Sequence, residues 1–256
     1  MRKVYVFFNI KLFTLYKLFK MSVLIFYAFF SNLLMAGGQV TPMLAEISPM
    51  GSGAQVRIIL ENNGLEKPLT FVVEPLMLEL DYQGNESLTP AEEDLLVIPP
   101  TVVVKPGKAQ TVLVQYIGDP TVQNSRSYRV IFKQEPINYN AGSNGGKSAK
   151  FLLGVNYNAL INLTPENSFA DPHVNSINTS SKGYWNVEVE NKGSRYARMS
   201  MSRWLLGDAS GRQVEISGKQ LMDKLDGSLV LPHSVRVFKM APIENFNVKH
   251  INIKML

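Results

Sequence analysis

The sequence of 256 residues predicts an all-β protein with two consecutive β-sandwich domains. Three observations support this fold class. Short apolar runs with alternating side chains recur after residue 37, turn-forming Gly, Pro and Asn residues separate them, and helical periodicity is almost absent. Strands with this spacing are typical of antiparallel sandwiches. One short helical stretch is expected, at residues 218–225.

The first domain is expected at residues 37–164. Each of its predicted strands is an apolar run that ends at a turn signal such as Asn62-Asn63-Gly64 or Pro106-Gly107. The predicted strands are 55–60, 69–78, 95–104, 110–116, 127–134 and 150–163. Two apolar strands flank the Pro99-Pro100 pair inside 95–104.

The second domain is expected at residues 165–256. A polar stretch at 164–182 separates it from the first domain, and a new series of apolar runs then begins. The predicted strands are 184–191, 195–206, 212–217, 228–232, 234–240 and 247–256. About 220 residues outside the leader are enough for two such domains.

Residues 1–36 are expected to be a signal peptide. Five cations and no acid occur there, and the apolar run 21–36 ends in Ala36 before Gly37-Gly38. This is the order of a secretory signal. The apolar run is shorter than the roughly 20 residues of a membrane-spanning helix. Two questions stay open: whether Met1 or Met21 is the start, and whether residues 4–35 are retained as a membrane anchor.

The charge of the chain argues against a nucleic-acid partner. The formal net charge is +5, but the five leader cations account for all of it, which leaves 21 cations and 21 anions from residue 37 onward. Binding to nucleic acid relies on an excess of cations. The chain has no cysteine, which excludes disulfides and thiolate chemistry. A periplasmic location fits an exported protein of this kind.

No residue pattern indicates catalysis. The histidines His173, His233 and His250 are not at ligand spacing with one another, and there is no G-x-S-x-G nucleophile motif. Gly145-Gly146-Lys147-Ser148 lacks the first glycine of a phosphate-binding loop. We therefore expect no enzyme activity, no metal and no cofactor.

The most informative segment is the predicted strand 150–163, which follows a Gly-, Asn- and Ser-rich loop at 139–149. One face of the segment is entirely apolar. Its members are Ala149, Phe151, Leu153, Val155, Tyr157, Ala159, Ile161 and Leu163. Two interpretations stay open. The face is either part of the domain's own core, or it lies on an edge strand and is offered to another protein by strand addition.

Several segments resemble the periplasmic pilus chaperones, the PapD-like family of chaperone–usher systems, and the resemblance covers essentially all of 38–256. The segments are ILENNG (59–64), LLVIPPTVVVKPGKAQTVLVQY (95–116), SYRVIFKQEPI (127–137), YWNVEVENKG (184–193) and LVLPHSVRVF (229–238). The order of these strands, more than any one motif, carries the resemblance. A divergent, archaic-type branch is compatible with it.

The resemblance implies two immunoglobulin-like domains set at an angle, in a periplasmic protein that needs no nucleotide. Such a protein holds pilus subunits by donor-strand complementation and passes them to an outer-membrane usher. The donated side chains would be Phe151, Leu153 and Val155, flanked by Ala149 and Tyr157. Whether free chaperone self-associates is left open. The alternative is a structural or adhesive surface protein in which the long strand is simply core.

One feature departs from the family. Many members hold the subunit's C-terminal carboxylate with an arginine in the first strand and a lysine in the long strand, positions that align with Glu46 and Leu160. The nearest basic substitutes are Arg129 and Lys133, which alternate along 127–134. The alternative for both is a solvated strand face. A disulfide that some members have in the second domain is also absent.

Overall fold

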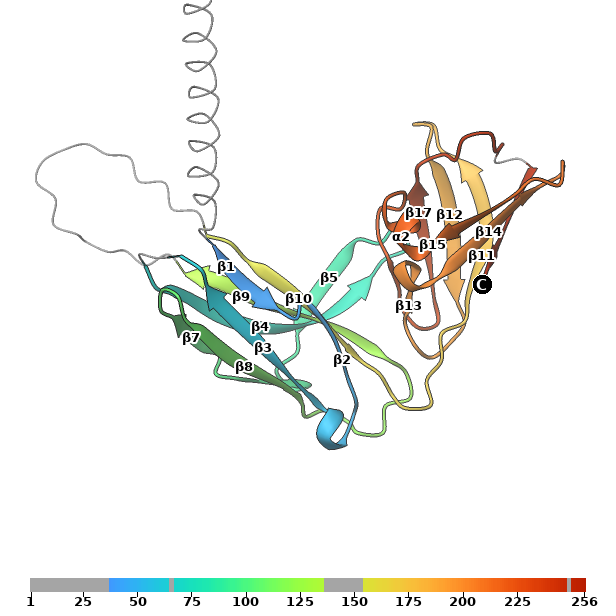
Figure 1. Cartoon of the computed structure of the whole chain (residues 1–256). Helices are drawn as coiled ribbons and strands as arrows, with labels where there is room; N and C mark the ends of the chain where they lie inside the picture. The colour runs from blue at the N-terminus through green and yellow to red at the C-terminus, as the bar shows by residue number, and fades with distance from the viewer. Residues whose placement is uncertain (1–36, 65–66, 136–153, 248–249) are drawn as a thin grey trace, which may run out of the picture.

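The computed structural model describes residues 37–64, 67–135, 154–247 and 250–256. These residues form two β-sandwich domains that meet at an angle (Figure 1). The predicted all-β fold is therefore confirmed. The predicted signal peptide, the loop at 139–149 and residues 150–153 lie outside the described residues. No helix among the described residues is long and apolar enough to cross a membrane.

One sheet of the first domain has four strands in the order β1-β3-β8-β6. Their bounds are Gly38–Thr41, Gln55–Asn62, Ala109–Tyr116 and Leu95–Ile98. All three pairings are antiparallel. Buried side chains alternate with exposed ones along β3 and β8, so one face packs inward.

The second sheet has the order β2-β10-β9-β4-β5, with β7 also pairing β4. The bounds are Leu44–Ile47, Tyr157–Leu163, Arg126–Glu135, Leu69–Leu80, Glu86–Pro90 and Thr101–Val104. The β2–β10 pair is parallel, while β10–β9 and β9–β4 are antiparallel. The chain crosses from the first sheet to the second between β6 and β7, at Pro99-Pro100.

The two sheets enclose the first core. It contains Phe71, Tyr128 and Phe132 from the second sheet and Ile58 and Leu60 from the first, each at most 1% exposed. Burying each side chain of this size contributes about 1.5–3 kcal/mol. Tyr128 also donates a hydrogen bond of 2.7 Å to Asp94, which satisfies its hydroxyl.

The second domain contains three small sheets, β11-β12-β17, β13-β16 and β15-β14-β18. In chain order the bounds are β11 Pro172–Thr179, β12 Trp185–Asn191, β13 Ala197–Arg198, β14 Arg203–Asp208, β15 Gln213–Ser217, β16 Leu229–Val230, β17 Ser234–Met240 and β18 Ile251–Met255. They surround a separate core that includes Trp185, Trp204 and Phe238.

The expected helix is present as α2, Gly218–Met222. It begins with a capping box, because Ser217 and Gln220 bond each other's backbone N–H groups. Two short 3-10 turns also occur, η1 at Gly51–Gly53 and η2 at Met199–Met201. The prediction of one strand over 195–206 was wrong, since η2 separates β13 from β14.

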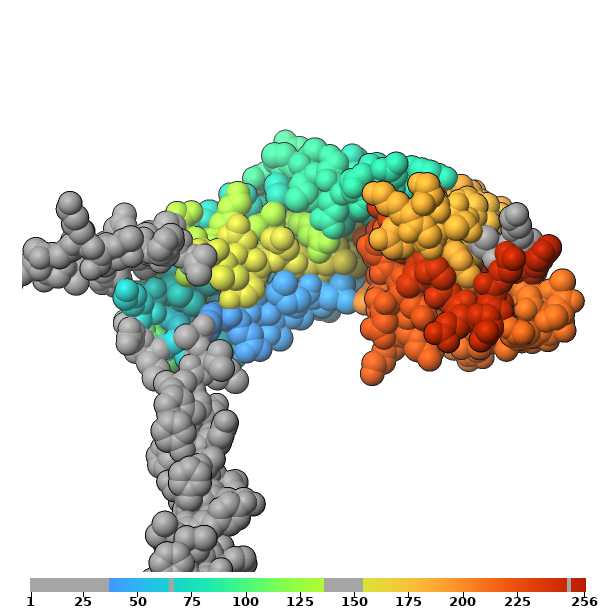
Figure 2. Space-filling view, turned by 90° about the horizontal axis from the view of Figure 1, so that it is seen from above, coloured from blue at the N-terminus to red at the C-terminus, as the bar shows by residue number. Residues whose placement is uncertain are grey.

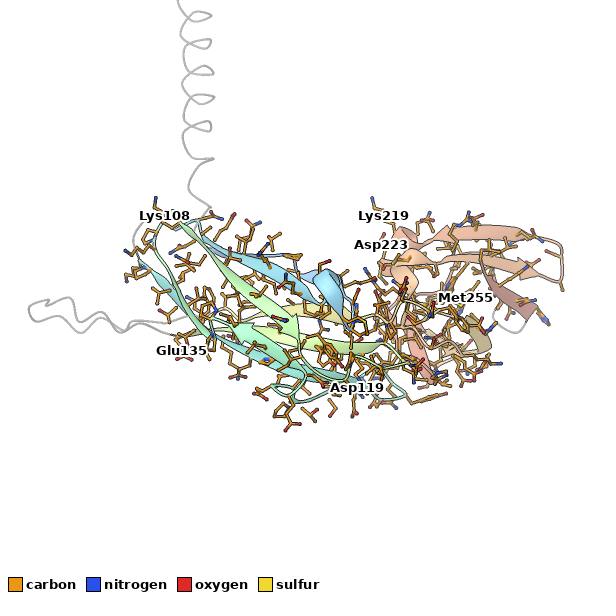
Figure 3. All side chains as sticks on the ribbon, turned by 90° about the horizontal axis from the view of Figure 1, so that it is seen from below. Lys108, Asp119, Glu135, Lys219, Asp223 and Met255 are labelled. Carbon is orange, nitrogen blue, oxygen red and sulfur yellow. The ribbon has the colours of Figure 1, made fainter. Side chains whose placement is uncertain are left out.

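The β4–β5 hairpin bridges the two domains. Its turn contacts β12 and β17 of the second domain. Figure 2, seen from above, shows the hairpin extending from the first domain onto the second. The Val237 amide donates to the Tyr82 carbonyl at 2.8 Å, and the Tyr82 hydroxyl donates to Glu188 at 2.5 Å. A small interdomain cluster of Leu78, Tyr196 and Leu229 adds buried apolar contact. Side chains fill this junction, as Figure 3 shows from below.

Candidate functional site

The end of β10 that lies away from the second domain has an open edge. On its other side β10 pairs with β9 from Tyr157 to Leu163, but β2 covers only Leu160–Leu163. The Leu160 amide donates to the Met43 carbonyl at 2.9 Å. Because main-chain groups alternate in direction along a strand, the N–H and C=O of Asn158 point to the same side as those of Leu160. In the described part of the chain, no strand pairs with Asn158 on that side.

Exposed apolar side chains border this edge. Val155, just before β10, is 49% exposed, and Met43 and Leu44 at the start of β2 are 42% and 36% exposed. An unpaired strand edge beside apolar side chains is a template for another strand. The open edge, from Gly154 to Asn158, is therefore the candidate binding site.

Strand β10 begins only at Tyr157. Within the described residues it is therefore shorter than the strand predicted over 150–163. Residues 154–156 are held to β9 by side chains instead. The Val155 amide donates to Gln134 Oε1 at 3.2 Å, and the Gln134 amide donates to Asn156 Oδ1 at 3.3 Å. Gly154 lies on the opposite face from the apolar side chains, and a glycine in a strand lowers its stability.

The structure divides the apolar face at Tyr157. Ala159, Ile161 and Leu163 are fully buried in the domain's own core. The Tyr157 ring packs edge-on against Phe71 at 6.0 Å between centroids, and its hydroxyl donates to the Gly38 carbonyl. Among the expected donor residues, Val155 is the one that the structure describes as exposed. Ala149, Phe151 and Leu153 lie outside the described residues.

Both candidate anchors point to the outer face of the sheet, opposite the buried Tyr128, Val130 and Phe132. Arg129 is paired with Glu86 on β5, with its Nε 3.1 Å from Glu86 Oε2. Lys133 Nζ lies 2.5 Å from Glu74 Oε2 on β4. Both cations therefore have intramolecular carboxylate partners.

At the positions where the family resemblance implies basic residues, Glu46 and Leu160 are on neighbouring strands. Glu46 is opposite Asn162, and Leu160 is opposite Leu44. Glu46 contacts the second domain: Arg195 donates to Glu46 Oε2 at 2.7 Å, and the Tyr196 hydroxyl donates to Oε1. Burial, followed by the hydrogen bond to Glu46, raises the pKa of Tyr196 above its usual range.

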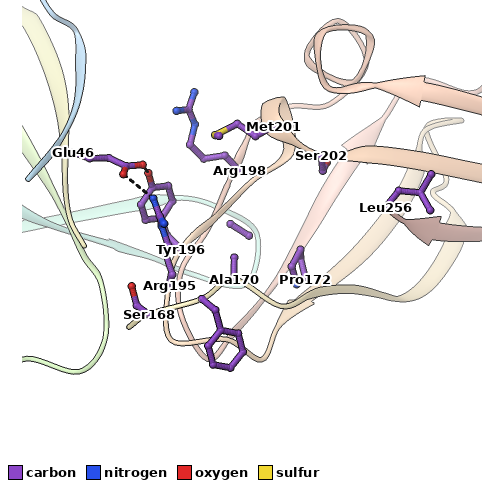
Figure 4. Close-up of a pocket in the computed structure, with 12 residues that line it drawn as sticks. Glu46, Ser168, Ala170, Pro172, Arg195, Tyr196, Arg198, Met201, Ser202 and Leu256 are labelled. Atoms are coloured by element: carbon purple, nitrogen blue, oxygen red, sulfur yellow. Dashed lines mark hydrogen bonds and ion pairs between the residues drawn. The ribbon is translucent and has the colours of Figure 1, made fainter. Parts of the chain in front are cut away.

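A pocket of about 460 Å³ lies between the domains, next to Glu46 (Figure 4). Apart from Glu46, its lining comes from residues 168–172, 195–202 and Leu256. The sequence missed this region because Arg195 and Glu46 are 149 residues apart. The one available signal was the run of arginines at 195, 198 and 203.

Sequence comparison and structure comparison gave different results. No family model matches the chain, and no curated protein matches it. A chain of the chaperone–tip subunit pre-assembly complex CsuC–CsuE, from the archaic Csu pili of Acinetobacter baumannii, matches with a TM-score of 0.56 and 14% identity. The alignment covers 86% of this chain and 97% of that one. The chain has the fold of fimbrial periplasmic chaperones.

Two further solved structures agree on the chaperone fold. A chain of the chaperone–tip adhesin complex of CFA/I fimbriae matches with a TM-score of 0.53 and 13% identity, over 86% of this chain and 98% of that one. The complex of the Salmonella enterica SafA pilin with the SafB chaperone matches with a TM-score of 0.50 and 14% identity, over 80% and 84%. The predicted resemblance to pilus chaperones is thereby confirmed at the level of fold.

The described residues contain no group of three or more His, Asp or Glu side chains placed to hold a metal ion. The three solved structures described above are named as chaperones or as chaperone complexes. The geometry of the candidate site, an open strand edge among apolar side chains, suits binding of an extended polypeptide.

Proposed function

We propose that this chain is a periplasmic chaperone that binds pilus subunits by donor-strand complementation and delivers them to an outer-membrane usher. The observation that carries the proposal is the open edge at Gly154–Asn158, in a fold shared with pilus chaperones. A subunit strand beside Asn158 would receive main-chain hydrogen bonds. Apolar side chains that precede Tyr157 would fill the subunit's incomplete core. The subunit's own unfinished folding supplies the free energy, so no cofactor is needed.

The division of the apolar face at Tyr157 supports a two-part strand. Residues 157–163 anchor the strand in the chaperone's core, with Ala159, Ile161 and Leu163 fully buried. The proposed donor set, Ala149, Phe151, Leu153 and Val155, lies before this anchor. A register shift by one residue would exchange the two faces, so a firmly buried anchor fixes which side chains are donated.

The carboxylate anchor is a separate part of the proposal. Arg129 and Lys133 lie on β9, the strand next to β10, on the outer face of the sheet. A C-terminal carboxylate of the subunit would replace Glu86 or Glu74 as their partner. Charge-assisted hydrogen bonds of this kind are shorter and stronger than neutral ones.

Co-expression with a pilus subunit from the same gene cluster tests the proposal. We expect wild-type protein to yield a soluble complex and the Leu153→Asp/Val155→Asp variant to yield none while remaining folded. Val103→Asp is a matched control, because Val103 is 50% exposed on β7, beyond β4. Equal complex yield from wild type and the double variant would reject donation by this strand. It would favour the alternative of a structural or adhesive protein.

A further inference from the structure

We propose that Arg198 in the interdomain pocket binds an acidic side chain on the folded surface of the bound subunit. This inference rests on the proposed chaperone function. It adds a second contact, on the second domain, to the strand edge on the first. The evidence is an arginine side chain without a partner, apolar side chains that are exposed along the same pocket, and the position of the pocket relative to the open edge.

In the pocket, the side chain of Arg198 lacks a carboxylate partner. The charged side chains of the lining are Glu46, Arg195 and Arg198. Both carboxylate oxygens of Glu46 are already engaged, one by Arg195 and one by Tyr196. Arg198 is half-buried, and its side chain has no hydrogen-bond or ion-pair partner within the described ranges. A guanidinium binds a carboxylate through two parallel hydrogen bonds, so a carboxylate is the partner that suits this side chain.

Large apolar side chains are exposed along the same pocket. Met201 is 74% exposed, Phe169 is 62% exposed and Leu256 is 51% exposed. Figure 4 shows Met201 beside Arg198 on the second-domain wall. A protein surface that covered these side chains would exclude water from Arg198, and a charged hydrogen bond is stronger in such surroundings. The occupant that fits is a carboxylate within an otherwise apolar patch of a protein surface.

The position of β2 separates this contact from the added strand. A subunit strand beside Asn158 cannot continue in the sheet past Leu160, because β2 occupies that edge from Leu44 onward. Glu46, at the pocket, is two residues farther along β2, which is about 7 Å. The pocket wall that carries Arg198 belongs to the other domain. We therefore assign the carboxylate to the subunit's folded body, which would lie in the angle between the domains, and not to the end of its chain.

A competition experiment tests the contact. Denatured subunit from the same gene cluster is refolded with equal amounts of wild-type and Arg198→Gln protein that carry different tags, and the two complexes are quantified. We expect wild type to be favoured about tenfold at low salt and less at high salt. Arg203→Gln is the control, because Arg203 is an exposed arginine that pairs with Glu215 and lies outside the pocket lining. Equal capture of wild type and Arg198→Gln would overturn the inference.

Two further arms identify the carboxylate and separate the two proposals. Amidation of the subunit's C-terminus should leave the preference for wild type unchanged, and loss of the preference would assign Arg198 to the chain end and overturn the inference. The Leu153→Asp/Val155→Asp variant should capture no subunit. If that variant fails while Arg198→Gln competes equally with wild type, the chaperone function stands and the pocket contact is rejected. If the Leu153→Asp/Val155→Asp variant captures subunit normally, the donor-strand proposal fails.

Discussion

Glu46 on β2 of the first domain accepts a 2.7 Å hydrogen bond from Arg195 of the second domain. The same carboxylate accepts from the Tyr196 hydroxyl, which is buried in the interdomain cluster. One side chain thus contacts two consecutive residues across the domain boundary. Glu46, at the position where the resemblance to pilus chaperones implies an arginine, therefore joins the two domains.

Removing this contact should widen the range of angles between the two domains, with only a small decrease in the free energy of unfolding. The exposed Glu46–Arg195 ion pair contributes no more than about 1 kcal/mol to the free energy of unfolding. In Glu46→Ala the buried Tyr196 hydroxyl also loses its acceptor. We expect a broader interdomain distance distribution by pulsed electron paramagnetic resonance, with spin labels on β3 and β12. Glu215→Ala, which breaks the exposed Arg203–Glu215 pair inside the second domain, should leave the distribution narrow. An unchanged distance distribution in Glu46→Ala would show that other contacts are enough to fix the angle between the domains.

The β4–β5 hairpin provides the second attachment, and Gly84 is its critical residue. Gly84 has φ +83°, and a Cβ there would lie 2.4 Å from Arg236 Nε. The Arg236 guanidinium packs over the Phe238 ring at 4.5 Å and donates to the Leu229 carbonyl at 2.7 Å. Burial lowers the pKa of Arg236 from its usual value. The guanidinium and the glycine backbone therefore fit closely at the boundary.

Gly84→Ala should therefore lower the free energy of unfolding by more than its φ strain alone would. Gly183 is the matched control, because its φ is +81° and nothing lies within 4 Å of a Cβ there. We expect Gly183→Ala to cost about 1 kcal/mol and Gly84→Ala about 2–3 kcal/mol in urea unfolding. Similar losses in the two variants would mean that the hairpin can move away from Arg236 without cost.

Much of this fold could be predicted because apolar and polar residues alternate along many of its strands. The strands at 55–62, 69–80 and 127–134 have an apolar residue at nearly every second position, and this period identifies a sheet with one buried face. Strand β11 could not be predicted in this way, since its sequence PHVNSINT has few large apolar side chains. It is a strand because it pairs with β12. Strands β1, β2 and β5 are too short or too polar to show the pattern.

The candidate site was only partly visible in the sequence. The sequence has an apolar face over 149–163, but the pattern is the same on both sides of Tyr157. Only the tertiary pairing with β9 and β2 shows which part is buried. The carboxylate partners of Arg129 and Lys133 are distant in sequence. Glu74 is on β4, next to β9, and Glu86 is on β5, one strand farther along the sheet. Such contacts depend on strand order, which local patterns do not specify.

Because Arg129 is paired with Glu86, the anchor proposal predicts opposite effects on subunit capture when each of the two residues is changed. Arg129→Ala should weaken subunit capture, because it removes the cation. Glu86→Gln should strengthen capture, because it frees Arg129 from its competing carboxylate. Relative capture is measured by competition with tagged wild-type protein. Lys133→Ala and Glu74→Gln form the equivalent pair of variants farther along the same face of β9. If Glu86→Gln and Arg129→Ala change capture in the same direction, Arg129 does not hold the carboxylate.

Alkaline pH should destabilise the first domain through Tyr128. Burial, together with the hydrogen bond to Asp94, raises the pKa of Tyr128 well above the unfolded value of 10.0. The folded state therefore keeps a proton that the unfolded state loses, so this stabilisation is complete below pH 10 and declines as the pH rises above it. In urea unfolding of the first domain, the free energy of unfolding should fall with pH above about 10. Tyr128→Phe cannot ionise, so its unfolding free energy should be lower at neutral pH but should fall less steeply above pH 10. Equal slopes in the two proteins would exclude Tyr128 as the group responsible.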